Sequence, residues 1–121
     1  MDIRNLDRDN MKAEYGALTQ RLMPWEAINA PFEGAWCVIE PGGASTPHSH
    51  HEYEIFVAIS GDAVLEANGE RSPFTRGDVA FMPPGTNHTI INESGTDFQF
   101  YSVWWDAEMT EKFAARHTST G

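Results

Sequence analysis

The sequence predicts an all-β fold, a small sandwich or barrel, for this chain of 121 residues. From Phe32 onward, short segments rich in β-branched and aromatic residues are separated by Gly, Pro, Asn and Asp, which is typical of such folds. The pair Asn68-Gly69 is the preferred sequence for a two-residue type I′ hairpin. No linker, repeat or low-complexity segment divides the chain, so we expect a single domain over residues 1–121 with one modest core.

The first thirty residues carry the weakest pattern. Apolar positions are scattered between Met11 and Leu22, and Gly16 argues against a long helix there. We expect one short strand around residues 19–23, which Pro24 ends. This region is therefore predicted to be an N-terminal extension of the β fold.

The strands of the predicted fold follow in order, each bounded by turn residues. They are expected at Ala35–Glu40, Tyr53–Ile59, Ala63–Ala67, Val79–Met82, Thr89–Asn92 and Phe98–Trp105. The second of these is almost continuously apolar, which predicts a strand buried on both faces.

The last strand carries aromatic residues on both faces. Side chains two positions apart share a face of a strand, so Phe98, Phe100 and Trp104 point one way. Tyr101 and Trp105 point the other way. One set should fill the interior and the other should pack outside, where surplus aromatic surface favours a homodimer.

A short helix is expected at the end of the chain. Asp106 is a good N-cap, and residues 107–116 place Met109 and Phe113 one turn apart. We expect this amphipathic helix to lay those two side chains on the sheet.

Composition excludes several classes of partner. Eighteen acidic and eight basic residues give a net charge of −10, which makes nucleic acid or an anionic membrane surface unsuitable. No apolar run could span a bilayer, and residues 1–8 lack the apolar core of a secretory signal, so a cytoplasmic location is expected. The single cysteine, Cys37, lies in an apolar run and is predicted to be a buried, inert thiol.

Clustered histidines indicate a metal site. Three of the five histidines and two carboxylates fall within seven consecutive positions. His48 and His50 share a face of an extended strand, and Glu54 follows on the same face if the strand is regular. His51 faces away and should be exposed, whereas His88 must reach the others from a distant strand, which a curled sheet allows. Imidazole and carboxylate together suit a first-row divalent ion.

Two spaced motifs occur in order along the chain. The pattern G-x5-H-x-H-x3,4-E-x6-G is matched by Gly42, His48, His50, Glu54 and Gly61. The pattern G-x5-P-x-G-x2-H-x3-N is matched by Gly77, Pro83, Gly85, His88 and Asn92. With both motifs complete, the sequence resembles the cupin superfamily. The resemblance implies a double-stranded β-helix (jelly-roll) barrel over about residues 32–105 with a short C-terminal helix over about residues 107–116. It also implies one divalent metal per chain, held by His48, His50, Glu54 and His88, and a homodimer.

Coordination chemistry leaves the identity of the metal open. Three histidines and one carboxylate on a six-coordinate ion leave two open positions, which suits Fe²⁺, Mn²⁺, Ni²⁺ or Co²⁺. Zn²⁺, the metal expected in the isolated protein, would be closed by the same four ligands unless Glu54 leaves or a fifth ligand enters. Glu54 is therefore either a ligand or a catalytic general base beside the metal.

A narrower resemblance concerns the reaction. Residues 46–56 and 101–106 are similar to cupins that accompany methionyl-tRNA-synthetase-like proteins in natural-product biosynthesis. This implies a zinc enzyme that rearranges an aminoacyl ester of an N-hydroxylated amine to a hydrazine, with a separate synthetase-like protein supplying the ester. The broader expectation is a metal-dependent enzyme acting on a small polar metabolite. The alternatives are a non-catalytic metabolite-binding or sensor cupin, an Fe²⁺-dependent dioxygenase, and a metal that only stabilises the barrel.

Overall fold

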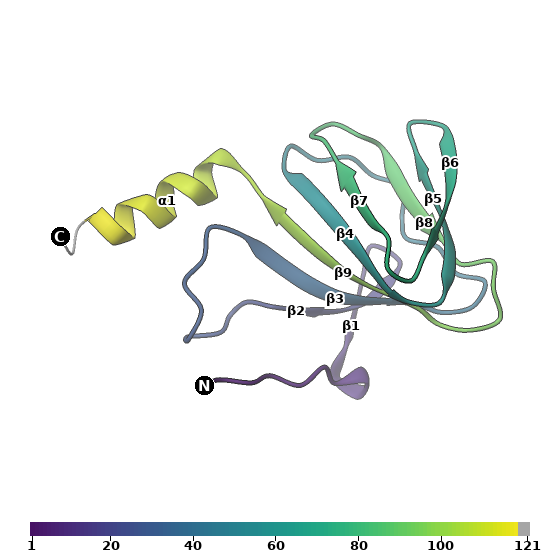
Figure 1. Ribbon diagram of the computed structural model, residues 1–121, viewed down its shortest axis with the longest axis horizontal. Helices are drawn as coiled ribbons and strands as arrows, with labels where there is room; N and C mark the ends of the chain where they lie inside the picture. Colours follow the sequence, from purple (N-terminus) through teal and green to yellow (C-terminus); the bar gives the residue numbers. More distant parts are fainter. Residues whose placement is uncertain (119–121) are drawn as a thin grey trace.

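A computed structural model describes residues 1–118 of the chain, with side-chain surroundings described to residue 116. Two antiparallel sheets make up the body, and one helix follows them (Figure 1). The larger sheet has the strand order β1-β2-β3-β9-β4-β7, and the smaller has the order β6-β5-β8. The strands are β1 (Lys12–Glu14), β2 (Ala17–Arg21), β3 (Glu33–Ile39), β4 (Tyr53–Ser60), β5 (Asp62–Ala67), β6 (Glu70–Thr75), β7 (Val79–Met82), β8 (His88–Ile91) and β9 (Phe98–Trp105). The helices are a 3-10 turn, η1 (Arg8–Asn10), and α1 (Ala107–Thr118).

This architecture confirms the predicted fold class, an all-β barrel with an N-terminal extension and a short C-terminal helix. One core lies between the two sheets, and strands β2 to β9 contribute to it, with alternate residues coming from the longer strands. Phe56 and Ala58 of β4 meet Leu65 of β5 and Ile90 of β8 there. Phe98, with none of its surface exposed, lies at the centre of the aromatic packing.

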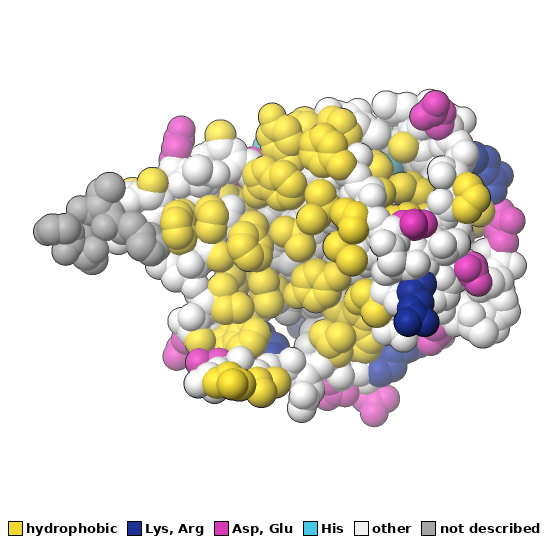
Figure 2. Space-filling model, viewed as in Figure 1, with side chains coloured by type: hydrophobic (Ala, Val, Ile, Leu, Met, Phe, Trp, Pro, Cys, Tyr) yellow, Lys and Arg dark blue, Asp and Glu magenta, His cyan; other side chains and the backbone are white. Residues whose placement is uncertain are grey.

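The prediction that β4 is buried on both faces was wrong. Phe56 and Ala58 are buried, but Tyr53 is 43% exposed and Ile59 is 38% exposed on the other face. The core covers one face of β4. The other face is also apolar, but its side chains are partly exposed, and the sequence does not show what they pack against. Figure 2 shows hydrophobic side chains spread over the region of β4, β7 and β9.

The N-terminal region forms a hairpin rather than one strand. The strand expected around residues 19–23 is β2, two residues earlier, and its partner β1 was not predicted. The turn between them uses Tyr15 at φ 50° and Gly16 at φ 79°. A tyrosine seldom adopts positive φ, so Tyr15-Gly16 is not one of the pairs that mark a two-residue hairpin turn in a sequence. The Asn68-Gly69 turn was predicted correctly, with both residues at positive φ between β5 and β6.

Helix α1 begins as expected, because the Asp106 carboxylate accepts a hydrogen bond from the backbone N–H of Met109 at 2.8 Å. It does not lie on the sheet as predicted but projects beyond the end of β9 (Figure 1). Arg116 donates a hydrogen bond at 2.9 Å to Asn29 in the loop between β2 and β3. Two apolar side chains one turn apart define a stripe on a helix but not the surface that the stripe meets.

No helix in the described part of the chain is both long and apolar enough to cross a membrane.

Candidate metal centre

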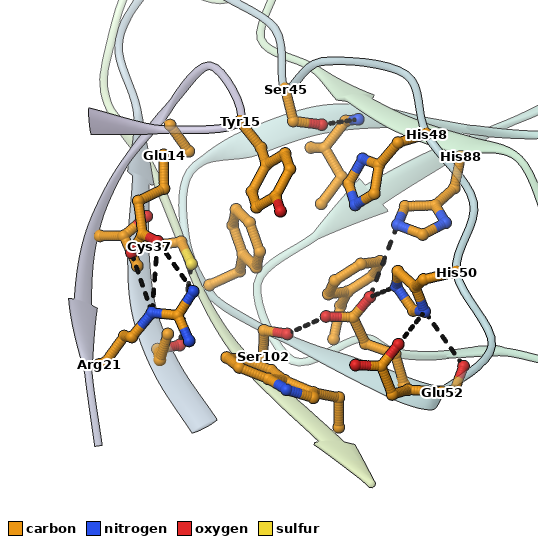
Figure 3. A pocket seen from close by; sticks show the side chains of 18 of the residues that line it. Glu14, Tyr15, Arg21, Cys37, Ser45, His48, His50, Glu52, His88 and Ser102 are labelled. Atoms are coloured by element: carbon orange, nitrogen blue, oxygen red, sulfur yellow. Dashed lines mark hydrogen bonds and ion pairs between the residues drawn. The ribbon is translucent and has the colours of Figure 1, made fainter. Parts of the chain in front are cut away.

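A cavity of about 400 Å³ opens on the inner face of the larger sheet (Figure 3). Its walls are apolar where the core supplies them, with Phe56, Ile90 and Phe100 among the lining side chains. Polar side chains lie at its two sides, the histidines on one and an arginine–glutamate pair on the other. Its volume is in the range of small-molecule sites.

Two segments forty residues apart bring the first and last predicted ligands together. The backbone N–H of His48 lies 3.3 Å from the carbonyl oxygen of His88, and the reverse bond is 3.0 Å long. This isolated bridge places the two imidazole rings 4.7 Å apart, between centroids. One ligating atom from each of His48, His50 and His88 lies within 4.8 Å of the others, a grouping that could hold a metal ion.

Backbone carbonyl groups orient all three imidazoles. Nδ1 of His48 lies 2.8 Å from the carbonyl oxygen of Thr46, and Nδ1 of His88 lies 2.9 Å from that of Thr86. Nδ1 of His50 lies 3.2 Å from the carbonyl oxygen of Glu52. A carbonyl oxygen accepts, so each Nδ1 is placed to carry a proton, and in the neutral imidazole Nε2 then keeps its lone pair. Metal-binding histidines are oriented in this way, with the outer nitrogen bonded to the protein.

Glu54 lies beside two of the three imidazoles. The side chain is buried, and its Oε1 lies 2.9 Å from Nε2 of His50 and 3.5 Å from Nε2 of His88. The hydroxyl of Ser102 donates a hydrogen bond to Oε2. In the neutral form of the imidazoles, Nε2 of His50 and of His88 presents a lone pair to the carboxylate, and these contacts become favourable when a cation lies among them.

Nε2 of His88 is better suited to bind a metal ion than to carry a proton. Its Nε2 is a buried polar atom without a hydrogen-bond partner, whereas such atoms are normally satisfied. Burial is the main cause that lowers the pKa of His88, so a proton there is disfavoured. The donor set and this orphaned nitrogen therefore suit a bound divalent cation.

The structure brings His48, His50 and His88 together and places Glu54 beside His50 and His88. Their role as metal ligands stays a prediction. His51 is exposed, as expected, and its Nε2 lies 2.8 Å from the Asp106 carboxylate. That contact is the main cause that raises the pKa of His51. The pKa of Asp106 is lowered, first by the backbone N–H of Met109 and then by His51.

Sequence reasoning missed the contribution of the N-terminal hairpin. Glu14, Tyr15 and Arg21 line the same cavity, and the Tyr15 ring stacks on the imidazole of His48. All three precede the motif-bearing segment by more than twenty positions, and no pattern in the sequence places them at the site. These residues reach the cavity because β2 pairs with β3, and that pairing is visible only in the tertiary structure.

The structure shows which aromatic side chains of β9 point into the core, a point that the sequence left open. Phe98 and Phe100 are buried in the core, and Trp104 packs against it and lines the cavity. Tyr101 and Trp105 lie on the outer face, where Trp105 stacks on Tyr53 with centroids 5.8 Å apart.

Comparisons with known proteins point to one family. Residues 35–104 match Cupin_2, described as a cupin domain. A Cupin 2 conserved barrel domain protein from Salinispora arenicola is 52% identical, with a TM-score of 0.93 over 97% of this chain and 98% of that one. The plu4264 protein from Photorhabdus luminescens is 44% identical, with a TM-score of 0.93 over 98% of this chain and 99% of that one.

A relative of known name matches over a shorter stretch. A protein from Thermotoga maritima named "Oxalate-binding protein" is 36% identical over 66 residues, which are 54% of this chain and 54% of that protein. The chain thus matches about half the length of this relative.

Proposed function

This chain belongs to the cupin family, and from that premise we propose that it is a metal-dependent enzyme acting on a small polar metabolite. His48, His50, His88 and Glu54 would hold one divalent transition metal. The observation that carries the proposal is the grouping of one ligating atom from each of His48, His50 and His88 within 4.8 Å of the others. The Glu54 carboxylate lies beside two of these imidazoles, and Nε2 of His88 is buried and unpartnered.

The metal would supply Lewis acidity, polarising an oxygen of the metabolite. The chain's own residues would hold and move protons around it. Glu54 is either a fourth ligand or the general base, and the Ser102 hydroxyl fixes which oxygen of Glu54 faces the histidines. The apolar walls, including Phe56 and Phe100, would limit access of water to the reacting atoms.

Two families of metal suit the donor set. Zn²⁺ is the ion we expect in the isolated protein, and Fe²⁺, Mn²⁺, Ni²⁺ or Co²⁺ would keep positions open for substrate. An Fe²⁺-loaded protein that consumes dioxygen with its substrate would be a cupin dioxygenase instead.

The finer reaction proposed is rearrangement of an aminoacyl ester of an N-hydroxylated amine to a hydrazine. It is an isomerisation, because the amino nitrogen bonds to the amine nitrogen as the N–O bond breaks. Glu54 would accept the proton that the amino group loses. The resemblance of residues 46–56 and 101–106 supports this reaction, and a separate synthetase-like protein would supply the ester.

A second candidate is non-catalytic binding of a metabolite. The name of the Thermotoga maritima relative favours it, because that protein is named for binding and not for turnover. Replacing Glu54 with Gln separates the two functions. A binding protein keeps its ligand affinity in E54Q, whereas an enzyme that uses Glu54 as a base keeps affinity and loses turnover.

Metal analysis tests the shared premise. Protein purified without a nickel-affinity step should contain about one transition metal per chain by ICP–MS, and H88A should contain far less. Chelation should lower the melting temperature of the wild type and leave that of H88A unchanged. A wild type with no metal, and no gain in melting temperature on adding Zn²⁺, Fe²⁺ or Mn²⁺, would refute the proposal.

The outer apolar face offers a partner surface. It comprises Tyr53, Ile55, Val57, Val79, Phe81 and Trp105 on β4, β7 and β9 (Figure 2). Val79 is 64% exposed and Phe81 is 52% exposed in the single chain. Large exposed apolar patches mark interaction surfaces, and we expect two copies of the chain to pair through this face.

A further inference from the structure

The wall of the cavity opposite the histidines carries an ion pair from the N-terminal hairpin (Figure 3). Nη2 of Arg21 donates to Oε1 of Glu14 at 2.8 Å, and Nε of Arg21 lies 3.3 and 3.2 Å from the two carboxylate oxygens. The hydrogen bond to Arg21 is the main cause that lowers the pKa of Glu14, so both groups are charged at neutral pH. Among the described residues that line the cavity, Arg21 is therefore the one fixed cation besides any metal.

Arg21 keeps donors for a ligand. Glu14 occupies the side of the guanidinium formed by Nε and Nη2, and the Trp104 ring lies 5.5 Å from Cζ. Nη1 has no hydrogen-bond partner among residues 1–116, and neither does the second N–H of Nη2. These N–H groups form the end-on fork that matches a planar carboxylate.

The strand register places this fork near the candidate metal centre. Arg21 pairs with Ala35 across β2 and β3, and Ala35 pairs with Ser102 across β3 and β9. Adjacent strands are about 4.8 Å apart, so the Cα atoms of Arg21 and Ser102 are separated by about 10 Å. The Ser102 hydroxyl in turn bonds to the Glu54 carboxylate. A small molecule in the cavity can therefore contact both the Arg21 guanidinium and the candidate metal centre.

We propose that Arg21 forms a second binding subsite, which takes a carboxylate of the ligand while the other end of the ligand reaches the histidines. The metal end rests on the proposed function, but the Arg21 end does not. Glu14, Glu52 and Glu54 also line the cavity, so a singly charged carboxylate fits better than a doubly charged phosphate. Arg21 precedes residue 35, where the family match begins, so this subsite is a feature of the hairpin.

The ligand carboxylate would compete with Glu14 for Arg21. A ligand carboxylate and the Glu14 carboxylate draw on the same guanidinium, so removing the charge of Glu14 should favour the ligand. An ion pair that only stabilises the hairpin predicts the opposite, because losing either partner would then weaken binding alike.

The test measures the affinity of two probes, glutarate and butyrate, for zinc-treated protein by NMR titration. Glutarate has a carboxylate at each end, whereas butyrate has only one. In R21Q, glutarate should bind about tenfold more weakly or worse, and butyrate should change less than twofold. R71Q is the matched control, because Arg71 also pairs with a glutamate, Glu93, but lies outside the cavity.

Two further arms complete the test. E14Q should bind glutarate as tightly as the wild type or more tightly, and inorganic phosphate should bind more weakly than glutarate. Equal losses for glutarate in R21Q and E14Q would overturn the proposal, as would R21Q behaving like R71Q. Metal content is measured in the same samples. If no metal binds, the proposed function fails, and the ratio of glutarate affinities between wild type and R21Q still decides the Arg21 subsite.

Discussion

The ring of Tyr15 stacks on the imidazole of His48, with centroids 4.8 Å apart and planes inclined by 15°. The carbonyl oxygen of Tyr15 also accepts a hydrogen bond from the backbone N–H of Thr46 at 2.7 Å. Thr46 in turn offers its own carbonyl oxygen to Nδ1 of His48. The N-terminal hairpin thus supports the candidate metal centre, although it precedes the residues that match the family.

Replacing Tyr15 should weaken metal binding in proportion to the lost stacking. An aromatic pair contributes about 0.5–1.5 kcal/mol, so Y15A should lower zinc affinity by about two- to tenfold, and Y15F should retain it. Competition against a chromogenic chelator measures the affinity. Y53A is the control, because Tyr53 stacks on the outer face, away from the cavity. Equal affinity in Y15A and the wild type would show that the stacking contributes nothing.

Gly16 should tolerate substitution less well than another glycine of similar backbone. A Cβ at Gly16 would lie 2.5 Å from the carbonyl oxygen of Ala44, whereas one at Gly69 would meet nothing within 4 Å. Both residues have positive φ, so each alanine costs about 1–2 kcal/mol of backbone strain. G16A adds a clash with backbone and should lose at least about 1 kcal/mol more stability than G69A. Urea unfolding of both variants measures the difference, and equal losses would mean that the loop moves aside.

The Ser102 hydroxyl should stabilise the buried carboxylate of Glu54. In S102A, Oε2 of Glu54 loses its donor, and a buried charged acceptor without a partner costs about 1–3 kcal/mol. Chemical denaturation measures the loss of stability. S72A provides the control, because Ser72 is exposed on β6 and should change stability by less than about 0.5 kcal/mol. A loss in S102A no greater than in S72A would contradict this role.

Cys37 should be unreactive in the folded protein. Burial raises the pKa of its thiol to about 12, so only about one molecule in ten thousand carries the thiolate at pH 8. Iodoacetamide should therefore alkylate Cys37 many times more slowly in buffer than in urea. The rates are followed by mass spectrometry, and similar rates in the two conditions would show that the thiol is accessible.

The outer apolar face should control association. F81D places a charge opposite Ile55, where the register pairs β4 with β7, and a paired copy would have to bury it. Sedimentation should give a dimer for the wild type and a monomer for F81D. S72D, on the exposed edge strand β6, should remain dimeric. A monomeric wild type would refute pairing through this face.

Much of the fold and the candidate site could be predicted from local patterns. Asn68-Gly69 and Asp106 act through their own backbone and neighbours, so the hairpin and the start of α1 followed from sequence. The spacing of His48 and His50 and the two cupin motifs identified the residues that the structure groups together. Their binding of a metal stays a prediction.

Tertiary structure alone decided what surrounds that group. Glu14, Tyr15 and Arg21 reach the cavity because β2 pairs with β3, and strand pairing depends on contacts between distant segments. In the same way, the apolar pattern of β4 was clear from sequence, but which of its faces the core covers was not. Turns and helix caps depend on neighbouring residues and can be predicted from them. Which strands pair, and which face of a strand is buried, depends on the whole folded chain.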